Sequence, residues 1–233
     1  MIAALANNEQ VSNYGAPMLD WNTIDTVLLD MDGTLLDLHF DNYFWQYHLP
    51  QAYARKHGVT REEAERVMFA QFVDKQHTLD WYCLDYWSRQ LGLDVVALKR
   101  DVQHLIAIRP GTLDFLRFLR ERGKRTVLIT NAHRGSLDLK MQHTGIDAWL
   151  DRLISSHDLG HPKEHPAFWQ ALAAHEPFVP ERTLFIDDTH HILDAAKRAG
   201  IAHALGIVMP DSKGSVREHD SHYLIEHFSE LLR

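Results

Sequence analysis

The chain has 233 residues, of which 45% are hydrophobic, and a formal net charge of -8. This charge and the lack of a basic block argue against a nucleic-acid polymer or an anionic membrane surface as the main partner. Cys83 is the only cysteine, so no intrachain disulfide can form, and we expect a reducing, cytoplasmic location. No run approaches the roughly 18 to 20 apolar residues of a membrane span. We read residues 1–20 as an N-terminal arm, since they open on a short apolar run without the basic residue of a signal peptide.

The first predicted strand, residues 26–29, runs directly into Asp30-Met31-Asp32-Gly33-Thr34. Neighbouring strand residues point to opposite sides, so Asp30 and Asp32 are expected to point the same way. Two like charges held this close require a cation or a proton between them. The segment therefore predicts a reaction centre, although Asp and Gly are also common in turns that have no further role.

Residues 41–106 form a segment with helical periodicity, many aromatic residues and no clear strand. Gly58 and Gly92 are stop signals there, and Thr60 and Asp94 are candidate N-caps. The pattern predicts an all-helical insert with four helices at 42–57, 60–73, 78–91 and 94–106.

Strands and helices alternate from Arg109 onward. We expect helices at 112–122, 136–144, 166–175 and 190–199, strands at 126–130, 152–155, 183–187 and 204–208, and a terminal helix at 225–232. This alternation predicts an α/β fold, a Rossmann-like parallel sheet with right-handed crossovers and helices on both faces. Residues 21–40 and 107–233 would form this core, and residues 41–106 the inserted domain.

Three predicted strands end in polar side chains: Asp30, then Thr130-Asn131, then Asp187-Asp188. In doubly wound sheets, ligands bind beyond the carboxyl ends of the strands. Polar residues at such ends can simply cap the next helix, but three of them on one sheet edge favour a binding site.

In this order, Asp30-x-Asp32-Gly33-Thr34-Leu35, Thr130-Asn131, Lys163 and Asp187-Asp188 resemble the four motifs of the haloacid dehalogenase superfamily of phosphotransferases. The helical insert is similar to that family's type 1 cap, a lid over the active site. The resemblance implies that Asp30 is the nucleophile, forming an aspartyl phosphate, and that Asp32 is the general acid and base.

The same resemblance implies phosphate binding by Thr130, Asn131 and Lys163. It further implies an Mg2+ site made by Asp30, the backbone carbonyl of Asp32, Asp187 and, through water, Asp188. Hard oxygen ligands suit Mg2+. Four carboxylates cannot accept a phosphate dianion as bare anions, so we expect activity to require the metal.

Several reaction classes remain open. A dehalogenase of the superfamily would normally lack Asp32 and the Asp187-Asp188 pair. A sugar-phosphate phosphatase or a phosphomutase would share all four motifs, and a non-catalytic binding module is a further alternative. The motifs favour a phosphomonoesterase that acts on a small molecule.

Substrate choice is expected to lie in the cap, where residues 40–46 and 77–87 are rich in aromatic residues. Such rings can build a small core or stack on a planar base, and Tyr43, Trp45 and Trp81 are our candidates for base contacts. Both segments are similar to the cap of bacterial purine 5'-nucleotidases that hydrolyse GMP and IMP, which implies a purine mononucleotide as substrate. The 17 histidines include no pair with convincing metal-ligand spacing. Surface solvation is the expected role for most of them, and His133 is a candidate for substrate contact.

Overall fold

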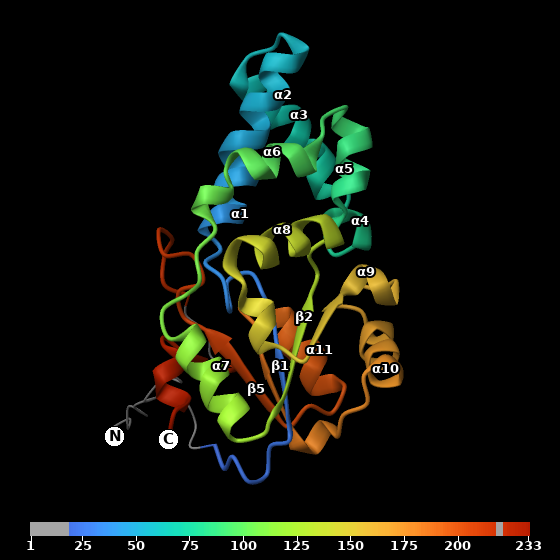
Figure 1. The fold of residues 1–233 in the computed structure, drawn as a ribbon. Helices are drawn as coiled ribbons and strands as arrows, with labels where there is room; N and C mark the ends of the chain where they lie inside the picture. Colours follow the sequence, from blue (N-terminus) through green and yellow to red (C-terminus); the bar gives the residue numbers. More distant parts are fainter. Residues whose placement is uncertain (1–18, 218–220) are drawn as a thin grey trace, which may run out of the picture.

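The computed structural model describes residues 19–217 and 221–233, and its centre is a six-stranded parallel sheet (Figure 1). The strand order is β3-β2-β1-β4-β5-β6. The strands are β1 (Thr26–Leu29), β2 (Arg125–Thr130), β3 (Arg152–Ser155), β4 (Thr183–Ile186), β5 (His203–Ile207) and β6 (Tyr223–Ile225). The expected Rossmann-like parallel sheet is confirmed.

Strand β1 lies between β2 and β4 and pairs with both in parallel register, with Leu29 opposite Leu128 and Ile186. The chain first builds outward from β1 to β2 and β3, then returns to add β4 on the other side. The direction of building changes beside β1. Its carboxyl end is therefore the topological switch point, where doubly wound sheets bind their ligands.

Helices cover both faces of the sheet because alternate strand residues point to opposite sides. Val27 and Leu29 pack in one core cluster with Phe115, whereas Leu28 packs in the other with Phe168. The helices of the core are α7 (Thr112–Glu121), α8 (Arg134–Thr144), α9 (Ser156–Leu159), α10 (Pro166–His175) and α11 (His190–Arg198). Short 3-10 turns lie at η3 (Ile146–Trp149) and η4 (Pro180–Arg182).

Helices α1 to α6 stand above the carboxyl ends of the strands (Figure 1). The elements of this cap are α1 (His39–Tyr43), the π-helical η1 (Phe44–His48), α2 (Leu49–His57), α3 (Arg61–Val73), α4 (Leu79–Tyr82), α5 (Leu84–Leu91), α6 (Val95–Asp101) and the 3-10 turn η2 (Gln103–Leu105). The helices between β1 and α7 agree with an inserted helical segment. Its division from the core at residues 41 and 106 stays an interpretation.

Two predicted cap helices are interrupted. Cys83 leaves helical geometry at φ -82° and ψ 109°, which separates α4 from α5, and its Sγ accepts a hydrogen bond from the Tyr86 N–H. The Trp87 Nε1–H donates to the Trp81 carbonyl at 2.9 Å, so this carbonyl is satisfied across the break. Val102 likewise separates α6 from η2. The predictions of Thr60 and Asp94 as N-caps are confirmed, since their side chains accept from Glu63 N and Ala97 N.

The predicted terminal helix at 225–232 is wrong. Residues Tyr223–Ile225 form β6, which pairs in parallel with β5, and only the 3-10 turn η5 (Phe228–Leu231) follows. Leu224 and Ile225 are buried and Phe228 stacks on Phe115 at 4.8 Å, so packing against the sheet decides the conformation of this short apolar run.

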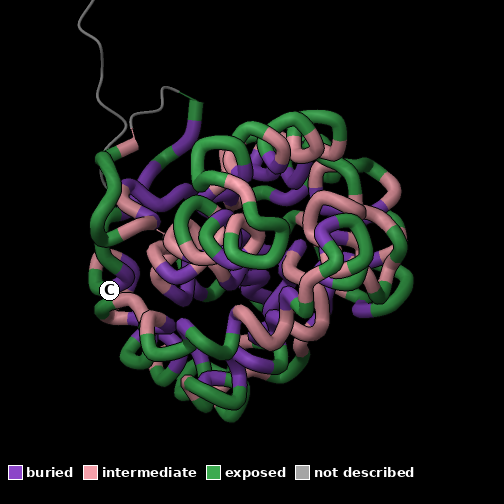
Figure 2. The backbone as a smooth tube through the Cα atoms, turned by 90° about the horizontal axis from the view of Figure 1, so that it is seen from above, coloured by how far each residue is buried: buried purple, intermediate pink, exposed green. Residues whose placement is uncertain are grey.

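Buried positions gather toward the centre of the molecule and exposed positions lie around its outside (Figure 2). Among the described helices, none is both long enough and apolar enough to cross a bilayer. The predicted N-terminal arm, residues 1–20, falls almost wholly outside the described residues.

Candidate active site

A cavity of about 940 Å3 lies between the cap and the carboxyl ends of the strands. It is lined by all seven residues that the motifs single out, together with aromatic side chains of the cap. The seven are Asp30, Asp32, Thr130, Asn131, Lys163, Asp187 and Asp188. Residues spread over more than 150 positions of sequence thus meet at the switch point of the sheet.

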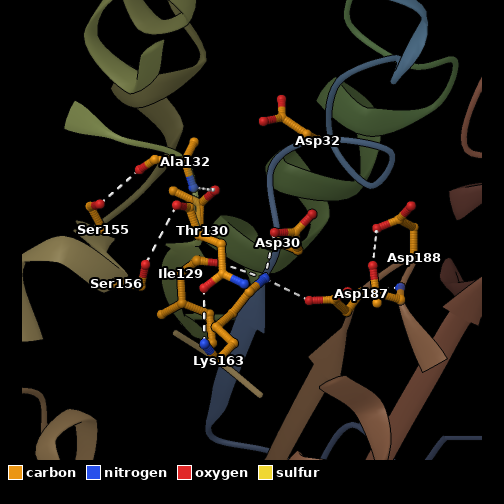
Figure 3. Close-up of polar contacts among 12 residues, drawn as sticks. Asp30, Asp32, Ile129, Thr130, Ala132, Ser155, Ser156, Lys163, Asp187 and Asp188 are labelled. Atoms are coloured by element: carbon orange, nitrogen blue, oxygen red, sulfur yellow. Dashed lines mark hydrogen bonds and ion pairs between the residues drawn. The ribbon is translucent and has the colours of Figure 1, made fainter. Parts of the chain in front are cut away.

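Lys163 joins the ends of β1 and β4. Its Nζ donates to Asp30 Oδ1 at 2.5 Å and to Asp187 Oδ2 at 2.6 Å, and all three side chains are buried (Figure 3). Burial raises the pKa of Asp30 to about 6 although Lys163 opposes the shift, and the pKa of Lys163 itself is raised by the two carboxylates. Lys163 is therefore a fixed cation beside the proposed nucleophile, as expected for neutralising a phosphoryl group.

Gly33 allows Asp188 to approach the turn that follows β1. Its φ is +82°, and a Cβ at this position would lie 2.7 Å from Asp188 Cγ and 2.9 Å from Pro210 Cβ. Any other residue would be strained and would displace this carboxylate. Asp187 and Asp188 are also held in place by Thr189, whose N–H donates to Asp187 Oδ1 at 2.8 Å and whose hydroxyl donates to Asp188 Oδ1 at 3.0 Å.

Asp30, Asp187 and Asp188 can place one carboxylate oxygen each within 4.8 Å of one another. Burial, the larger cause, and neighbouring carboxylates raise the pKa of Asp187 and of Asp188 to about 6, although Lys163 and Arg217 oppose these shifts. The trio therefore carries negative charge that its nearby cations do not fully offset. A small divalent cation with a preference for oxygen ligands, such as Mg2+, fits this donor set. The carboxylate of Asp32 is not part of the trio.

The carboxylate of Asp32 instead contacts Lys140, a residue of α8 that the sequence analysis missed. Lys140 Nζ donates to Asp32 Oδ1 and to Asp41 Oδ2, each at 2.6 Å, and Asp41 Oδ1 accepts from Lys99 Nζ at 2.6 Å. Both lysines are only 1% exposed. The sequence did hold a signal, because position 140 shares a helical face with the buried Leu137, where a lysine requires a partner.

Thr130 is the last residue of β2 and lies near Asp30 and Lys163 (Figure 3), and Asn131 directly follows it in the chain. The Thr130 hydroxyl accepts from the Ala132 N–H at 3.0 Å, which leaves its own O–H available as a donor. Asn131 Oδ1 accepts from the Lys163 N–H at 2.9 Å, so this side chain holds the lysine loop against β2. The Asn131 side chain has a positioning role that the motif alone did not indicate.

Ser136 is a further pocket residue that the sequence analysis missed. It is 3% exposed, lines the cavity and has a buried hydroxyl without a hydrogen-bond partner in the described structure. His133, which was a candidate for substrate contact, also lines the cavity. An unsatisfied hydroxyl at the cavity wall can donate to a polar ligand atom.

The three aromatic candidates of the cap lie in different places. Trp45 and Trp81 line the cavity, and both pack edge-on against Phe72, at 5.8 and 5.6 Å between ring centroids. These rings belong to a small aromatic core and also line the cavity. Tyr43 is not among the lining residues and instead contacts Tyr47 at 5.7 Å. Tyr43 and Trp45 face different directions because residues two positions apart do not share a helical face.

A family model for haloacid dehalogenase-like hydrolases matches residues 24–200. The chain belongs to this family of hydrolases, which confirms the resemblance seen in its motifs. GMP/IMP nucleotidase YrfG of Escherichia coli strain K12 is 49% identical over 212 residues, which cover 91% of this chain and 96% of that protein.

The chain is also similar to more distant proteins, one by sequence and one by structure. Pyrophosphatase PpaX of Oceanobacillus iheyensis is 24% identical over 220 residues, which cover 90% of this chain and 96% of that protein. The crystal structure of a HAD phosphatase from Thermococcus onnurineus superposes with a TM-score of 0.75 at 23% identity, covering 89% of this chain and 96% of that one. This structural likeness supports the fold.

Proposed function

We propose that the protein is an Mg2+-dependent phosphomonoesterase that hydrolyses purine nucleoside 5'-monophosphates, with GMP and IMP as its preferred substrates. The observation that carries the proposal is that Asp30 and Asp32 open into the same cavity as Trp45 and Trp81. A volume of about 940 Å3 is sufficient for a mononucleotide. The 49% identity to a GMP/IMP nucleotidase supports the choice of base.

In the first step, a carboxylate oxygen of Asp30 attacks phosphorus, and the bond from phosphorus to the ester oxygen of the nucleoside breaks. Asp32 donates its proton to that leaving oxygen. The pKa of Asp32, raised to about 6 chiefly by its burial and then by Asp41, suits a group that must hold a proton near neutral pH. An aspartyl phosphate on Asp30 and a free nucleoside result.

In the second step, Asp32 accepts a proton from water while the water oxygen attacks the aspartyl phosphate, which restores Asp30 and releases inorganic phosphate. Lys163, the Thr130 hydroxyl and backbone N–H groups after β2 offset the charge that develops on the phosphoryl oxygens. Asp30, Asp187 and the backbone carbonyl of Asp32 would hold Mg2+, with Asp188 supporting it through water, and the ion would supply further positive charge at the phosphoryl oxygens.

We also propose a cytoplasmic location, which the single cysteine of the chain supports.

The test is a ranking of phosphomonoesters by kcat/KM with and without Mg2+. The panel includes GMP, IMP, AMP, pyrimidine nucleotides, sugar phosphates and p-nitrophenyl phosphate. We expect GMP and IMP to rank first and activity to be lost on metal removal. A sugar phosphate at the head of the ranking, or conversion of a sugar phosphate to its isomer, would replace the proposal with the alternatives named above. No turnover of any ester would indicate a binding module.

A further inference from the structure

Three side chains from distant parts of the chain meet where the cap touches the core, outside the set of residues that line the cavity. His77 lies in the loop between α3 and α4, Glu164 directly follows Lys163, and His191 lies in the first turn of α11. One ligand atom from each can lie within 4.8 Å of the other two. The spacing of the histidines along the sequence does not reveal this cluster, because these two imidazoles are 114 positions apart and only the fold brings them together.

Glu164 is fixed as a carboxylate. Its Oε1 accepts from the Tyr82 hydroxyl at 2.5 Å, and its Oε2 accepts from Asn131 Nδ2 at 2.9 Å. Burial of this side chain, which is only 11% exposed, acts to raise the pKa of Glu164. The nearby His191 and the hydrogen bonds from Tyr82 and Asn131 outweigh burial, and the pKa falls to about 2. Among the described residues, no lysine or arginine forms an ion pair with it. Carboxylates that bind metals are commonly held in this way by hydrogen bonds from neighbouring side chains.

The two imidazoles approach this carboxylate without reaching hydrogen-bond distance. His77 Nδ1 lies 3.9 Å and His191 Nε2 lies 3.6 Å from Glu164 Oε1. Hydrogen bonds between such groups would be about 2.7 to 3.2 Å long. Ligand atoms around a tetrahedral metal with bonds of about 2.0 to 2.1 Å stand about 3.3 to 3.5 Å apart. The observed separations of 3.9 and 3.6 Å are longer than this, and both imidazoles are at least half exposed, so rotations of the two exposed side chains would bring their nitrogens to ligand distance.

We propose that His77, Glu164 and His191 form a binding site for a divalent transition-metal ion of the Zn2+ class, which joins the cap to the core. Two imidazoles and one carboxylate are a ligand set that Zn2+ accepts, with water in the fourth position. This set differs in chemistry from the trio of Asp30, Asp187 and Asp188, because imidazole suits Zn2+ whereas Mg2+ selects oxygen. The two sites therefore differ in the ion that they prefer.

Metal at this site fixes the cap above the cavity, since His77 belongs to the cap and His191 to the core. Asn131 connects the two sites through Lys163, because it contacts Glu164 and the backbone of Lys163, whose Nζ contacts Asp30 and Asp187. If the proposed function holds, the bound ion slows the exchange of substrate and product, and Zn2+ inhibits turnover even when Mg2+ saturates the catalytic site.

The binding test uses Co2+ as a spectroscopic probe in the presence of excess Mg2+. Tetrahedral Co2+ with imidazole ligands absorbs visible light strongly. Co2+ bound only by carboxylate oxygens and water does not give this spectrum. We expect this signal in the full chain and a rise in Kd of about tenfold or more in His77→Asn and in His191→Gln, since loss of a ligand costs at least as much as loss of an outer hydrogen bond. Asparagine tolerates the φ of +63° at position 77, so the backbone is preserved.

Two matched variants control for other histidines. His104→Ala removes an exposed imidazole of the cap, and His161→Ala removes one member of the stacked pair His161 and His165. Both are expected to bind Co2+ as the parent chain does. Equal Co2+ affinity in the parent, His77→Asn and His191→Gln would overturn the proposal, as would loss of the signal only in His161→Ala.

Inhibition by Zn2+ is measured separately, with the best phosphomonoester of the panel and excess Mg2+. We expect inhibition of the parent and relief of at least part of it in His77→Asn. The same Zn2+ response in both would overturn the effect on exchange while leaving the spectroscopic result standing. If no ester is turned over, the proposed function fails, but the Co2+ spectra still decide whether the metal site exists.

Discussion

Lys140 Nζ lies 2.6 Å from Asp32 Oδ1 and 2.6 Å from Asp41 Oδ2, which ties the proposed general acid and base to the first helix of the cap. The other carboxylate oxygen of Asp41, Oδ1, forms an ion pair with Lys99 Nζ at 2.6 Å. Burial would lower the pKa of Lys140, but the two carboxylates outweigh it and the pKa is raised. The lysine therefore remains charged, and it holds the Asp32 carboxylate in one orientation.

Replacement of Lys140 by methionine is expected to lower kcat about 100-fold with little change in KM, because Asp32 loses its orientation. The pKa of Asp32 should also rise, since the lysine charge lowers it, and the pH profile of kcat/KM should shift toward higher pH. Asp32 loses its ion-pair partner while Asp41 keeps Lys99, and removal of the buried lysine should cost about 3 to 5 kcal/mol of stability. Steady-state kinetics at several pH values measure the changes in kcat and in the pH profile, and thermal unfolding measures the loss of stability.

The control for this variant is Lys197→Met, which removes an exposed lysine of α11. An unshifted pH profile in Lys140→Met, with a loss of stability alone, would show that Lys140 serves the fold and does not position Asp32.

Asparagine at position 30 should abolish both phosphate release and the covalent phosphoryl enzyme, because an amide cannot replace the attacking carboxylate. Beryllium fluoride binding to Asp30, followed by mass spectrometry or NMR, provides a readout other than turnover. Substantial residual phosphate release by the Asp30→Asn protein would assign the nucleophile to another residue.

The Asp32→Asn variant should behave differently from the one at position 30. We expect beryllium fluoride and Mg2+ still to bind, while turnover falls about 100- to 10,000-fold through loss of the proton donor and acceptor. The loss should be smaller with p-nitrophenyl phosphate, whose leaving group needs little protonation. Equal losses with nucleotide and p-nitrophenyl phosphate would argue against Asp32 as the acid.

Stability of the metal-free protein is expected to depend on the acidic trio. The pKa values of Asp30, Asp187 and Asp188 are raised to about 6 in the folded protein from an ordinary 3.8. The folded state therefore binds these protons more tightly than the unfolded chain does. The resulting contribution to the free energy of unfolding is complete below about pH 3.8 and is lost as pH rises through about 6. Mg2+ binds the deprotonated groups, and its stabilising effect should therefore grow from about pH 5 to about pH 7.5.

Thermal unfolding with and without Mg2+ at these two pH values measures this effect, with Asp187→Asn as the control in which the increment should shrink. A Mg2+ increment in Tm that is the same at both pH values would contradict the assignment of the trio as the metal site.

If Trp45 and Trp81 stack on the nucleotide base, their loss should weaken nucleotide binding, and Tyr43 of the same cap provides a control. Trp45→Ala and Trp81→Ala should each raise KM for GMP about 5- to 150-fold, the equivalent of about 1 to 3 kcal/mol per stacked base, with a smaller rise for p-nitrophenyl phosphate. Tyr43→Ala, which removes an aromatic ring of the same cap outside the cavity, should leave the ratio of the two KM values unchanged. Equal rises for both substrates would indicate that the tryptophans only support the packing of the cap.

Local sequence predicts the first five strands of the sheet, the helices between them, and the placement of polar residues at the ends of β1, β2 and β4. These features depend on side-chain alternation, caps and short-range turns, all of which lie within a few residues. It did not determine β6, because Tyr223–Ile225 is too short to reveal whether a neighbouring strand will pair with it.

The position of the proposed chemistry, at Asp30, can be read from local sequence, since a buried strand followed by an acidic pair and a glycine is a local pattern. The partners of the other charges follow from the folded arrangement alone: Lys140 with Asp32, and Glu164 between His77 and His191. Such pairings depend on how helices, loops and the cap pack around the ends of the strands, and residues about 30 to 110 positions apart carry no local signal of which neighbour they will meet.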